Sequence, residues 1–449
     1  MLYNLQSLLL LPFFLGNVIA SVGRQPQSIS VHIRNGTVFG VDDDTNQVLR
    51  FLGVPYAQPP VGDLRLRHAI PLNKSFGSLH AKAFGPVCVG PDIDSNPNSS
   101  EDCRTLNICR PFEHKNVNQL KPVLVWFYGG GLQRGYTADP IFNGTNIVRI
   151  SSEINKEIVL VSVNYRLGPL GFLNGQQMAD LDLLNLGMLY ANLNPFRVAS
   201  REIRQSSHDH RQCVYLSSFQ TAKPQHHTTA NTDEGTTSAP IGINATEQLS
   251  IPLADGFFRP RNLPNSTVSK LLSLYHNSPH HGCPYNTGST RLTPGKLDKK
   301  ACSIFGDVVQ IGPARTIAQW LSKNSRLDDN TNVAVYRYRF NHLPQDTDAS
   351  NIAAGIGTGL EERYVFSNLV PDHPWDRNLA YEMSSVWISF AHDLDPNPRG
   401  ESTLPFWPEY GDEGKSMVFS GYGSSIEEDT YRAEAIEYII ETVLPDGAL

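Results

Sequence analysis

The sequence predicts an α/β protein with a mostly parallel central sheet. Two short apolar runs, Val123–Phe127 and Ile158–Val163, lack the alternation of half-exposed strands and are typical of strands buried on both faces. A loop rich in Gly or Pro follows each run. Because functional groups gather at the carboxyl ends of parallel strands, the glycines after Tyr128 mark a candidate site.

Composition allows one large unit and argues against nucleic acid as a partner. The chain has 449 residues, 40% of them hydrophobic, which is enough for a substantial core. Its formal net charge is −7, and no cluster of Lys and Arg is present to neutralise phosphates.

The N-terminus has the pattern of a signal peptide, which we assign to residues 1–20. Leu8–Leu15 is an apolar core segment, and Val18–Ala20 precedes a cleavage site after Ala20. No later segment is long and apolar enough to span a bilayer. Glycosylation sequons begin at Asn35, Asn73, Asn98, Asn143, Asn244 and Asn265. Together these patterns predict a secreted glycoprotein.

Four motifs, in order, carry a resemblance to a known family. They are Phe51–Arg65, Ser100–Cys103, Val123–Gly131 and Val161–Phe172. In these motifs the chain resembles the type-B carboxylesterase/lipase family of α/β-hydrolases. The resemblance covers most of residues 30–189 and resumes at about Thr232. It implies an α/β-hydrolase fold that acts on a small-molecule carboxylic ester without a cofactor.

The stretch between the matching parts looks foreign to the family. The predicted organisation is residues 21–189 and 231–449 as two parts of one hydrolase domain, separated by a disordered stretch at 190–230. That stretch has scattered charges and little apolar periodicity. The resemblance implies that the strand leading to the nucleophile elbow, and the elements after it, are missing here, so the fold is expected to be incomplete.

Some catalytic parts of the family are present. The resemblance assigns the oxyanion hole to Gly130 and Gly131, where glycine lets the backbone approach a substrate. The Asp-Glu-Gly turn that follows Thr232 matches the family's acid, which makes Glu234, and not Asp233, the group that orients a catalytic histidine.

The base and the nucleophile are not found. Counting back from Phe366, Thr358 occupies the family's histidine position, and a threonine hydroxyl cannot act as a general base near neutral pH. His342, His373 and His392 lie in matching regions, but each is expected to be a surface or structural histidine.

No Gly-x-Ser-x-Gly occurs anywhere in the chain. Residues 213–218 could form a short strand ending in Ser217 and Ser218, but these serines lack the flanking glycines of a nucleophile elbow. The nucleophile is therefore unknown.

Other local expectations concern cysteines, one ion pair and the C-terminus. The resemblance implies a disulfide between Cys88 and Cys103, and an ion pair of Arg65 with Glu101 that is buried. Proximity in sequence suggests a second pair, Cys283 with Cys302, leaving Cys109 and Cys213. No C-x-x-C supports a zinc site, so no metal is expected. Ser425 to about Val443 reads as a helix capped by Ser425.

The sequence therefore predicts a carboxylic ester hydrolase by descent that is inactive as the chain stands. The alternatives are a non-catalytic, esterase-like binding or adhesion protein, and a truncated or mis-spliced gene product. Substrate preference and oligomeric state are left open.

Overall fold

The protein is described by a computed structural model. The described residues are 29–43, 45–91, 97–112, 121–187, 213–216, 225–254, 263–290, 293–324, 334–344, 354–370, 373–397 and 402–443. The assigned signal peptide, residues 1–20, lies outside them. No helix in this part of the chain combines the length and the apolar character needed to cross a membrane.

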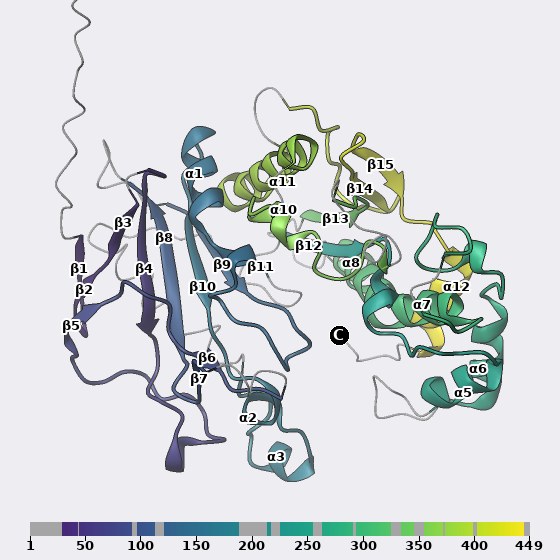
Figure 1. Ribbon diagram of the computed structural model, residues 1–449, viewed down its shortest axis with the longest axis horizontal. Helices are drawn as coiled ribbons and strands as arrows, with labels where there is room; N and C mark the ends of the chain where they lie inside the picture. Colours follow the sequence, from purple (N-terminus) through teal and green to yellow (C-terminus); the bar gives the residue numbers. More distant parts are fainter. Residues whose placement is uncertain are drawn as a thin grey trace, which may run out of the picture.

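A six-stranded sheet forms the N-terminal part (Figure 1). Its spatial order is β11-β9-β10-β8-β4-β3. The strands are β3 (Val41–Asp43), β4 (Val48–Pro55), β8 (Thr105–Pro111), β9 (Val123–Phe127), β10 (Val159–Val163) and β11 (Cys213–Leu216). β10, β9 and β11 are parallel, whereas β8, β4 and β3 continue the sheet in antiparallel pairs. Every residue of β9 and β10 is buried, which explains why their sequences do not alternate.

A four-stranded sheet forms the centre of the C-terminal part, in the order β12-β13-β14-β15. The strands are β12 (Gln225–Asn231), β13 (Ala334–Phe340), β14 (Lys415–Phe419) and β15 (Ser425–Glu428). The first three are parallel and β15 is antiparallel. Among the described strands, β11 and β12 do not pair, so the parallel strands fall into two sheets. The combined architecture is the α/β class that the sequence predicts, with antiparallel strands at the outer edges.

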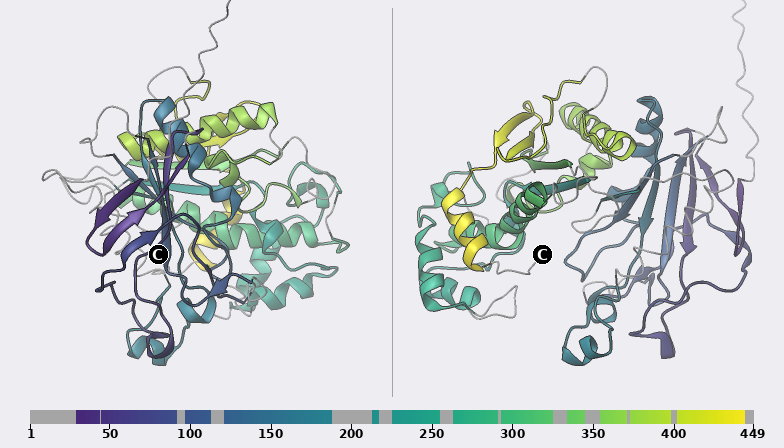
Figure 2. Two further views of the ribbon diagram at one scale, coloured as in Figure 1. Left: turned by 60° about the vertical axis from the view of Figure 1, so that its left-hand side comes forward. Right: turned by 180° about the vertical axis from the view of Figure 1, so that it is seen from behind.

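Two smaller sheets and the helices complete the described chain. The smaller sheets contain β1 (Ser30–Ile33), β2 (Gly36–Phe39) and β5 (Gly77–His80), and β6 (Val87–Cys88) with β7 (Ser99–Ser100). The α-helices are α1 (Thr145–Glu153), α2 (Gly168–Phe172), α3 (Gln176–Asp180), α5 (Thr246–Ala254), α6 (Asn265–Ser273), α7 (Asp298–Gly306), α8 (Gly312–Asn324), α10 (Glu362–Val365), α11 (Pro374–Asp393) and α12 (Ala433–Tyr438). In both views of Figure 2, α5, α6 and α7 lie on the side away from the N-terminal sheet.

One hydrophobic core joins the two sheets. It contains β9 and β10 together with side chains of β13, β14 and α11. Trp126 at the end of β9 contacts Phe366, with ring centroids 4.9 Å apart. Helices α1 and α11 pack against each other, and α11 lies between the N-terminal sheet and strands β14 and β15 (Figure 1). The N- and C-terminal parts therefore form one body although their sheets are separate.

The structure corrects the expectation for the C-terminal segment. Ser425–Glu428 is strand β15, not the first turn of a helix, and the helix begins at Ala433. The strand pairs with β14, and Glu427 binds Arg339 at 2.7 Å. Pairing with a tertiary neighbour therefore outweighs the local capping pattern at Ser425.

The stretch 190–230 contains two strands in its described portion. β11 is the short strand that the sequence suggested at residues 213–218, and it pairs with β9. β12 begins at Gln225, so the regular C-terminal structure starts before residue 231. The other residues of the stretch, Ser217 and Ser218 among them, lie outside the described residues.

Of the two disulfides expected from the sequence, one is present. Cys88 and Cys103 form a disulfide, with Cα atoms 5.0 Å apart. Cys283 and Cys302 are unpaired, contrary to the pairing suggested by their proximity in sequence. Cys283 is buried, and its Sγ lies 3.6 Å from a carboxylate oxygen of Asp233. Closeness along the chain did not determine the bonding partner.

Candidate active site

The glycine loop directly follows β9, as the sequence predicts. Gly130 and Gly131 have φ values of 119° and 61°, which side chains other than glycine rarely adopt. A Cβ atom on Gly130 would lie 2.2 Å from the carbonyl oxygen of Arg134, so the turn requires glycine there. Gly129–Gly131 are exposed, and the N–H groups of Gly130 and Gly131 donate to no acceptor among the described residues. Within this part of the chain, the loop therefore has two backbone donors that are not used by the fold.

Two stacked tyrosines pack next to the start of the glycine loop. The rings of Tyr128 and Tyr165 are buried, with centroids 4.5 Å apart. The hydroxyl of Tyr165 donates a 2.6 Å hydrogen bond to the carbonyl oxygen of Tyr128. This hydrogen bond joins the end of β9 to the segment after β10. It fixes the position of Tyr128, the residue that precedes the glycines.

Glu234 begins a short 3₁₀ helix, η3 (Glu234–Thr237), just after β12. Its side chain is buried, and Oε1 accepts a 2.5 Å hydrogen bond from the backbone N–H of Asn231. Burial, together with the charge of Glu361, raises the pKa of Glu234 to about 7, although hydrogen bonds from Thr358 and Asn231 oppose that shift. The carboxyl group of Glu234 is therefore protonated more readily than that of an exposed glutamate.

The carboxylate of Asp233 has a different environment from that of Glu234. One of its oxygens accepts from the N–H of Tyr285 and the other from the N–H of Ile356, both at 2.8 Å. Through its two carboxylate oxygens, Asp233 therefore joins the loop that contains Tyr285 to the loop that contains Ile356.

Thr358, which the resemblance placed at the family's histidine position, lies against Glu234. Its hydroxyl donates a 2.5 Å hydrogen bond to Oε2 of Glu234 and lies 3.2 Å from the hydroxyl of Thr237. The Thr358 side chain is exposed. The acid thus has a hydroxyl partner that carries no basic nitrogen.

The three candidate histidines lie elsewhere. His342 is buried and binds Asp376, with 2.5 Å between Nε2 and Oδ1, while its Nδ1 accepts from the N–H of Gly421. His392 contacts Asp393, its neighbour in sequence. His373 precedes α11 as its N-cap. Among the described residues, no hydrogen bond joins any of the three to Glu234 or Thr358.

Three residues of the site were not identified from the sequence. The side-chain amide of Asn231 donates to Glu361 at 2.6 Å and to the carbonyl oxygen of Gly357 at 2.7 Å, joining the acid turn to the Thr358 loop. Glu362 lies between this loop and the glycine loop, since a Cβ atom built on Gly129 would lie 3.7 Å from its Oε1. The signal in the sequence was the pair of adjacent glutamates, Glu361 and Glu362, close to Thr358.

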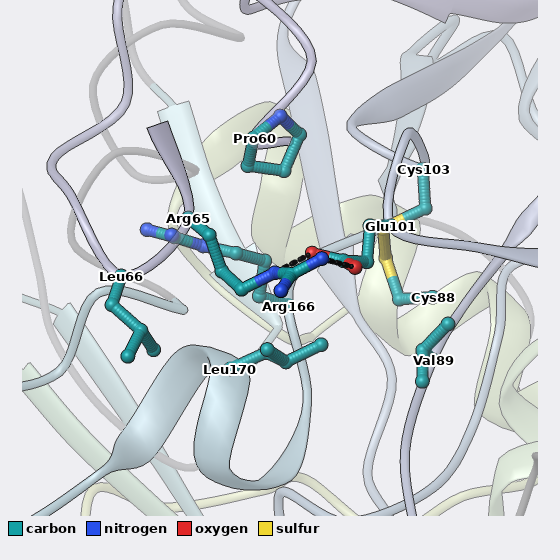
Figure 3. A pocket seen from close by; sticks show the side chains of 9 residues that line it. All are labelled: Pro60, Arg65, Leu66, Cys88, Val89, Glu101, Cys103, Arg166 and Leu170. Carbon is teal, nitrogen blue, oxygen red and sulfur yellow. Dashed lines mark hydrogen bonds and ion pairs between the residues drawn. A yellow bond between two sulfur atoms is a disulfide. The ribbon is translucent and has the colours of Figure 1, made fainter. Parts of the chain in front are cut away.

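The Arg65–Glu101 pair borders a pocket beside the disulfide (Figure 3). The guanidinium binds both carboxylate oxygens, at 2.7 and 2.5 Å. The expectation of a buried pair is wrong, because 53% of the Arg65 side chain is exposed. The pocket also contains Arg166 and Leu170, whereas Gly130, Glu234 and Thr358 do not line it. Within the described part of the chain, no cluster of His, Cys, Asp and Glu is suited to a metal ion.

The arrangement defines the class of protein as an α/β-hydrolase. A glycine loop follows one central parallel strand, and an acid turn that meets the next loop at Thr358 follows another. The sequence profile described as the Carboxylesterase family matches residues 27–188 and 216–438. The chain therefore belongs to the carboxylesterase family.

Individual relatives agree with this assignment. Lipase 1 of Geotrichum candidum is 24% identical, with 94% of this chain and 97% of the lipase covered. Fumonisin B1 esterase of Sphingopyxis macrogoltabida is 38% identical over 36% of this chain and 29% of the esterase. The crystal structure of Aspergillus niger EstA superposes with a TM-score of 0.74 at 19% identity, covering 93% of this chain and 99% of EstA, which shows the shared fold.

The comparisons also locate an interruption. The family match stops at residue 188 and resumes at 216, earlier than Thr232. The alignment with Lipase 1 extends over 577 positions, more than the 449 residues of this chain, so segments of the lipase have no counterpart here.

Proposed function

We propose that this chain is a secreted carboxylesterase-family protein that can bind an acyl carbonyl but does not hydrolyse esters. The observation that carries the proposal is the hydrogen bond from Thr358 to Glu234, which gives the acid a partner unable to take a proton from a nucleophile. The missing Gly-x-Ser-x-Gly supports it as well.

The glycine loop supports carbonyl binding. The N–H groups of Gly130 and Gly131 are exposed and have the backbone form that an oxyanion hole uses. Such donors bind a ground-state carbonyl even where no covalent step follows. The proposed ligand is a neutral carboxylic ester.

Secretion is supported by three independent features. Residues 1–20 have a signal-peptide pattern, and the Cys88–Cys103 disulfide suits an oxidising compartment. Asn73, Asn98 and Asn265 are exposed sequon asparagines. Intact-mass measurement of protein secreted from eukaryotic cells, before and after glycosidase treatment, tests this part of the proposal.

The activity test uses the purified full chain with 4-nitrophenyl butyrate and a fluorophosphonate probe. We expect hydrolysis no faster than with heat-denatured protein and no covalent label. Losing the nucleophile or base alone costs a serine protease on the order of a million-fold in kcat. Stoichiometric labelling that maps to Ser217, Ser218 or another serine would overturn the proposal. A Thr358→His variant is the matched control, because a base without a nucleophile should leave the protein inactive.

A second candidate, an aberrant gene product, is favoured by the interruption at 189–215. Sequencing of transcripts across the codons for Leu189 and Thr232 distinguishes the two. A dominant transcript that encodes additional residues there would make this chain a truncated or mis-spliced form. A transcript identical to the present sequence would favour a non-catalytic binding or adhesion protein.

A further inference from the structure

The carboxyl group of Glu362 occupies the space between two glycines. A Cβ atom on Gly129 of the glycine loop would lie 3.7 Å from Oε1, and a Cβ atom on Gly359 would lie 3.4 Å from Oε2. Gly359 is the residue after Thr358. The carboxyl group therefore lies where the Thr358 loop meets the glycine loop, at a point where neither backbone carries a side chain.

This carboxyl group has no partner among the described residues. Within the described part of the chain, its oxygens take part in no hydrogen bond or ion pair, although the backbone of Glu362 is hydrogen-bonded within the turn that leads into α10. Its side chain is half-buried. Burying an unpartnered carboxyl group costs less free energy when the group is neutral than when it is ionised.

The groups that face Glu362 favour the neutral form. Burial raises the pKa of Glu362 to about 8, the charges of Glu361 and Asp139 add to that shift, and Arg363 opposes it. Tyr165, after β10, and Tyr338, on β13, also interact electrostatically with Glu362, and both are neutral because burial raises their pKa values. At neutral pH the carboxyl group is therefore mostly an O–H donor.

The glycine loop next to it offers donors of the same kind. Gly130 and Gly131 are exposed residues, and their N–H groups donate to no acceptor among the described residues. A protonated carboxyl beside them adds a further donor for an oxygen bound at the loop. An ionised carboxylate there would instead repel the partial negative charge of that oxygen.

We propose that protonated Glu362 is a ligand-binding residue that, with the N–H groups of Gly130 and Gly131, holds the carbonyl oxygen of a neutral acyl ligand, and that its ionisation releases the ligand. The inference rests on the proposed acyl-binding function and adds to it a residue that controls binding. It also assigns a preference for uncharged ligands over free carboxylates, since a free carboxylate would meet the charges of Glu361 and Asp139, which also act on Glu362, as like charges.

The test measures binding of butyranilide, an uncharged amide analogue of phenyl butyrate, by calorimetry across a pH series. For the wild-type chain we expect affinity to fall about 10- to 30-fold between about pH 6 and pH 9.5, because only the protonated fraction binds. In Glu362→Gln, which mimics the protonated form, affinity should stay nearly constant. Glu382→Gln on α11, whose carboxyl is also half-buried, is the matched control and should keep the wild-type profile.

The outcomes separate this inference from the function on which it rests. A Glu362→Gln variant that binds with an unchanged pH profile overturns the role of Glu362 alone. Absence of binding by the wild-type chain at every pH overturns acyl binding itself. Because a variant can lose binding through misfolding, the titration of ¹³C-labelled Glu362 is followed by NMR in the wild-type chain. A carboxyl midpoint that does not coincide with the midpoint of binding would also contradict the proposal.

Discussion

The hydroxyl of Thr358 donates to Oε2 of Glu234 at 2.5 Å, and the backbone N–H of Asn231 donates to Oε1 at the same distance. Both oxygens of a buried carboxyl are thus satisfied by neutral donors. In a catalytic triad one of these partners is an imidazole that becomes positively charged during reaction. A threonine hydroxyl does not carry such a charge, so the group that faces Glu234 here differs from the imidazole of a triad.

The stability of the protein should decrease as pH rises from about 4.5 through neutrality. The folded-state pKa of Glu234 is raised from 4.5 to about 7, so between these values the unfolded chain binds fewer protons than the folded one. This contribution is fully present below about pH 4.5 and lost as pH rises through about 7. In Glu234→Gln the unfolding free energy at about pH 8 should exceed that of the wild type by about 1–3 kcal/mol, and by less at pH 4.5. Urea denaturation at both pH values checks this, and a wild-type stability that rises over the interval would contradict it.

Removing the Thr358 hydroxyl should destabilise the folded chain. Thr358→Val keeps the shape of the side chain but takes one donor from a buried carboxyl, at an expected cost of about 1–3 kcal/mol. Because that hydrogen bond lowers the pKa of Glu234, the pKa should rise in the variant. Thr358→Ser, which keeps the hydroxyl, is the control. Equal melting temperatures for the Val and Ser variants would show that the bond does not contribute.

Loss of the Cys88–Cys103 disulfide should lower stability by about 3 kcal/mol, the value expected for a loop of this length. The bond closes a sequence separation of 15 residues. Peptide mapping without reductant should recover the linked pair in the mature protein, with Cys283 and Cys302 as free thiols. A Cys283→Ser variant serves for comparison, since it removes no bond. Finding Cys88 and Cys103 both free would rule out the linkage.

Removing the buried charge of Asp429 should strongly lower the stability of the folded chain. Its two oxygens lie 2.6 Å from Nη2 of Arg315 and 2.7 Å from Nε of Arg337, and the side chain is fully buried. Asp429→Asn leaves two buried guanidinium groups uncompensated, at an expected cost of about 3–5 kcal/mol. The exposed i,i+4 pair Arg149 with Glu153 is the control, and Glu153→Gln should change stability by less than about 1 kcal/mol. Similar effects at the two sites would argue against the burial of Asp429.

Part of the site could be predicted because its signals are local. Three glycines after an apolar run mark a turn that needs positive φ values, and the count back from Phe366 selected Thr358, which contacts Glu234 in the structure. The contacts of Glu362 and Asn231 could not be predicted, because they join segments that are more than one hundred residues apart in sequence. Neither residue belongs to a motif that specifies its partner.

The sequence by itself determined the family, the buried parallel strands β9 and β10, the glycine loop and the absence of a Gly-x-Ser-x-Gly turn. These properties follow from residue type and short-range pattern. Only the tertiary structure decided that Ser425–Glu428 is a strand, that Arg65 is half-exposed, and that Cys283 and Cys302 stay unpaired. It also decided that the parallel strands divide into two sheets around one shared core. The physical reason is that strand pairing, burial and side-chain bonding depend on which distant segments are brought together, and local sequence does not encode those neighbours.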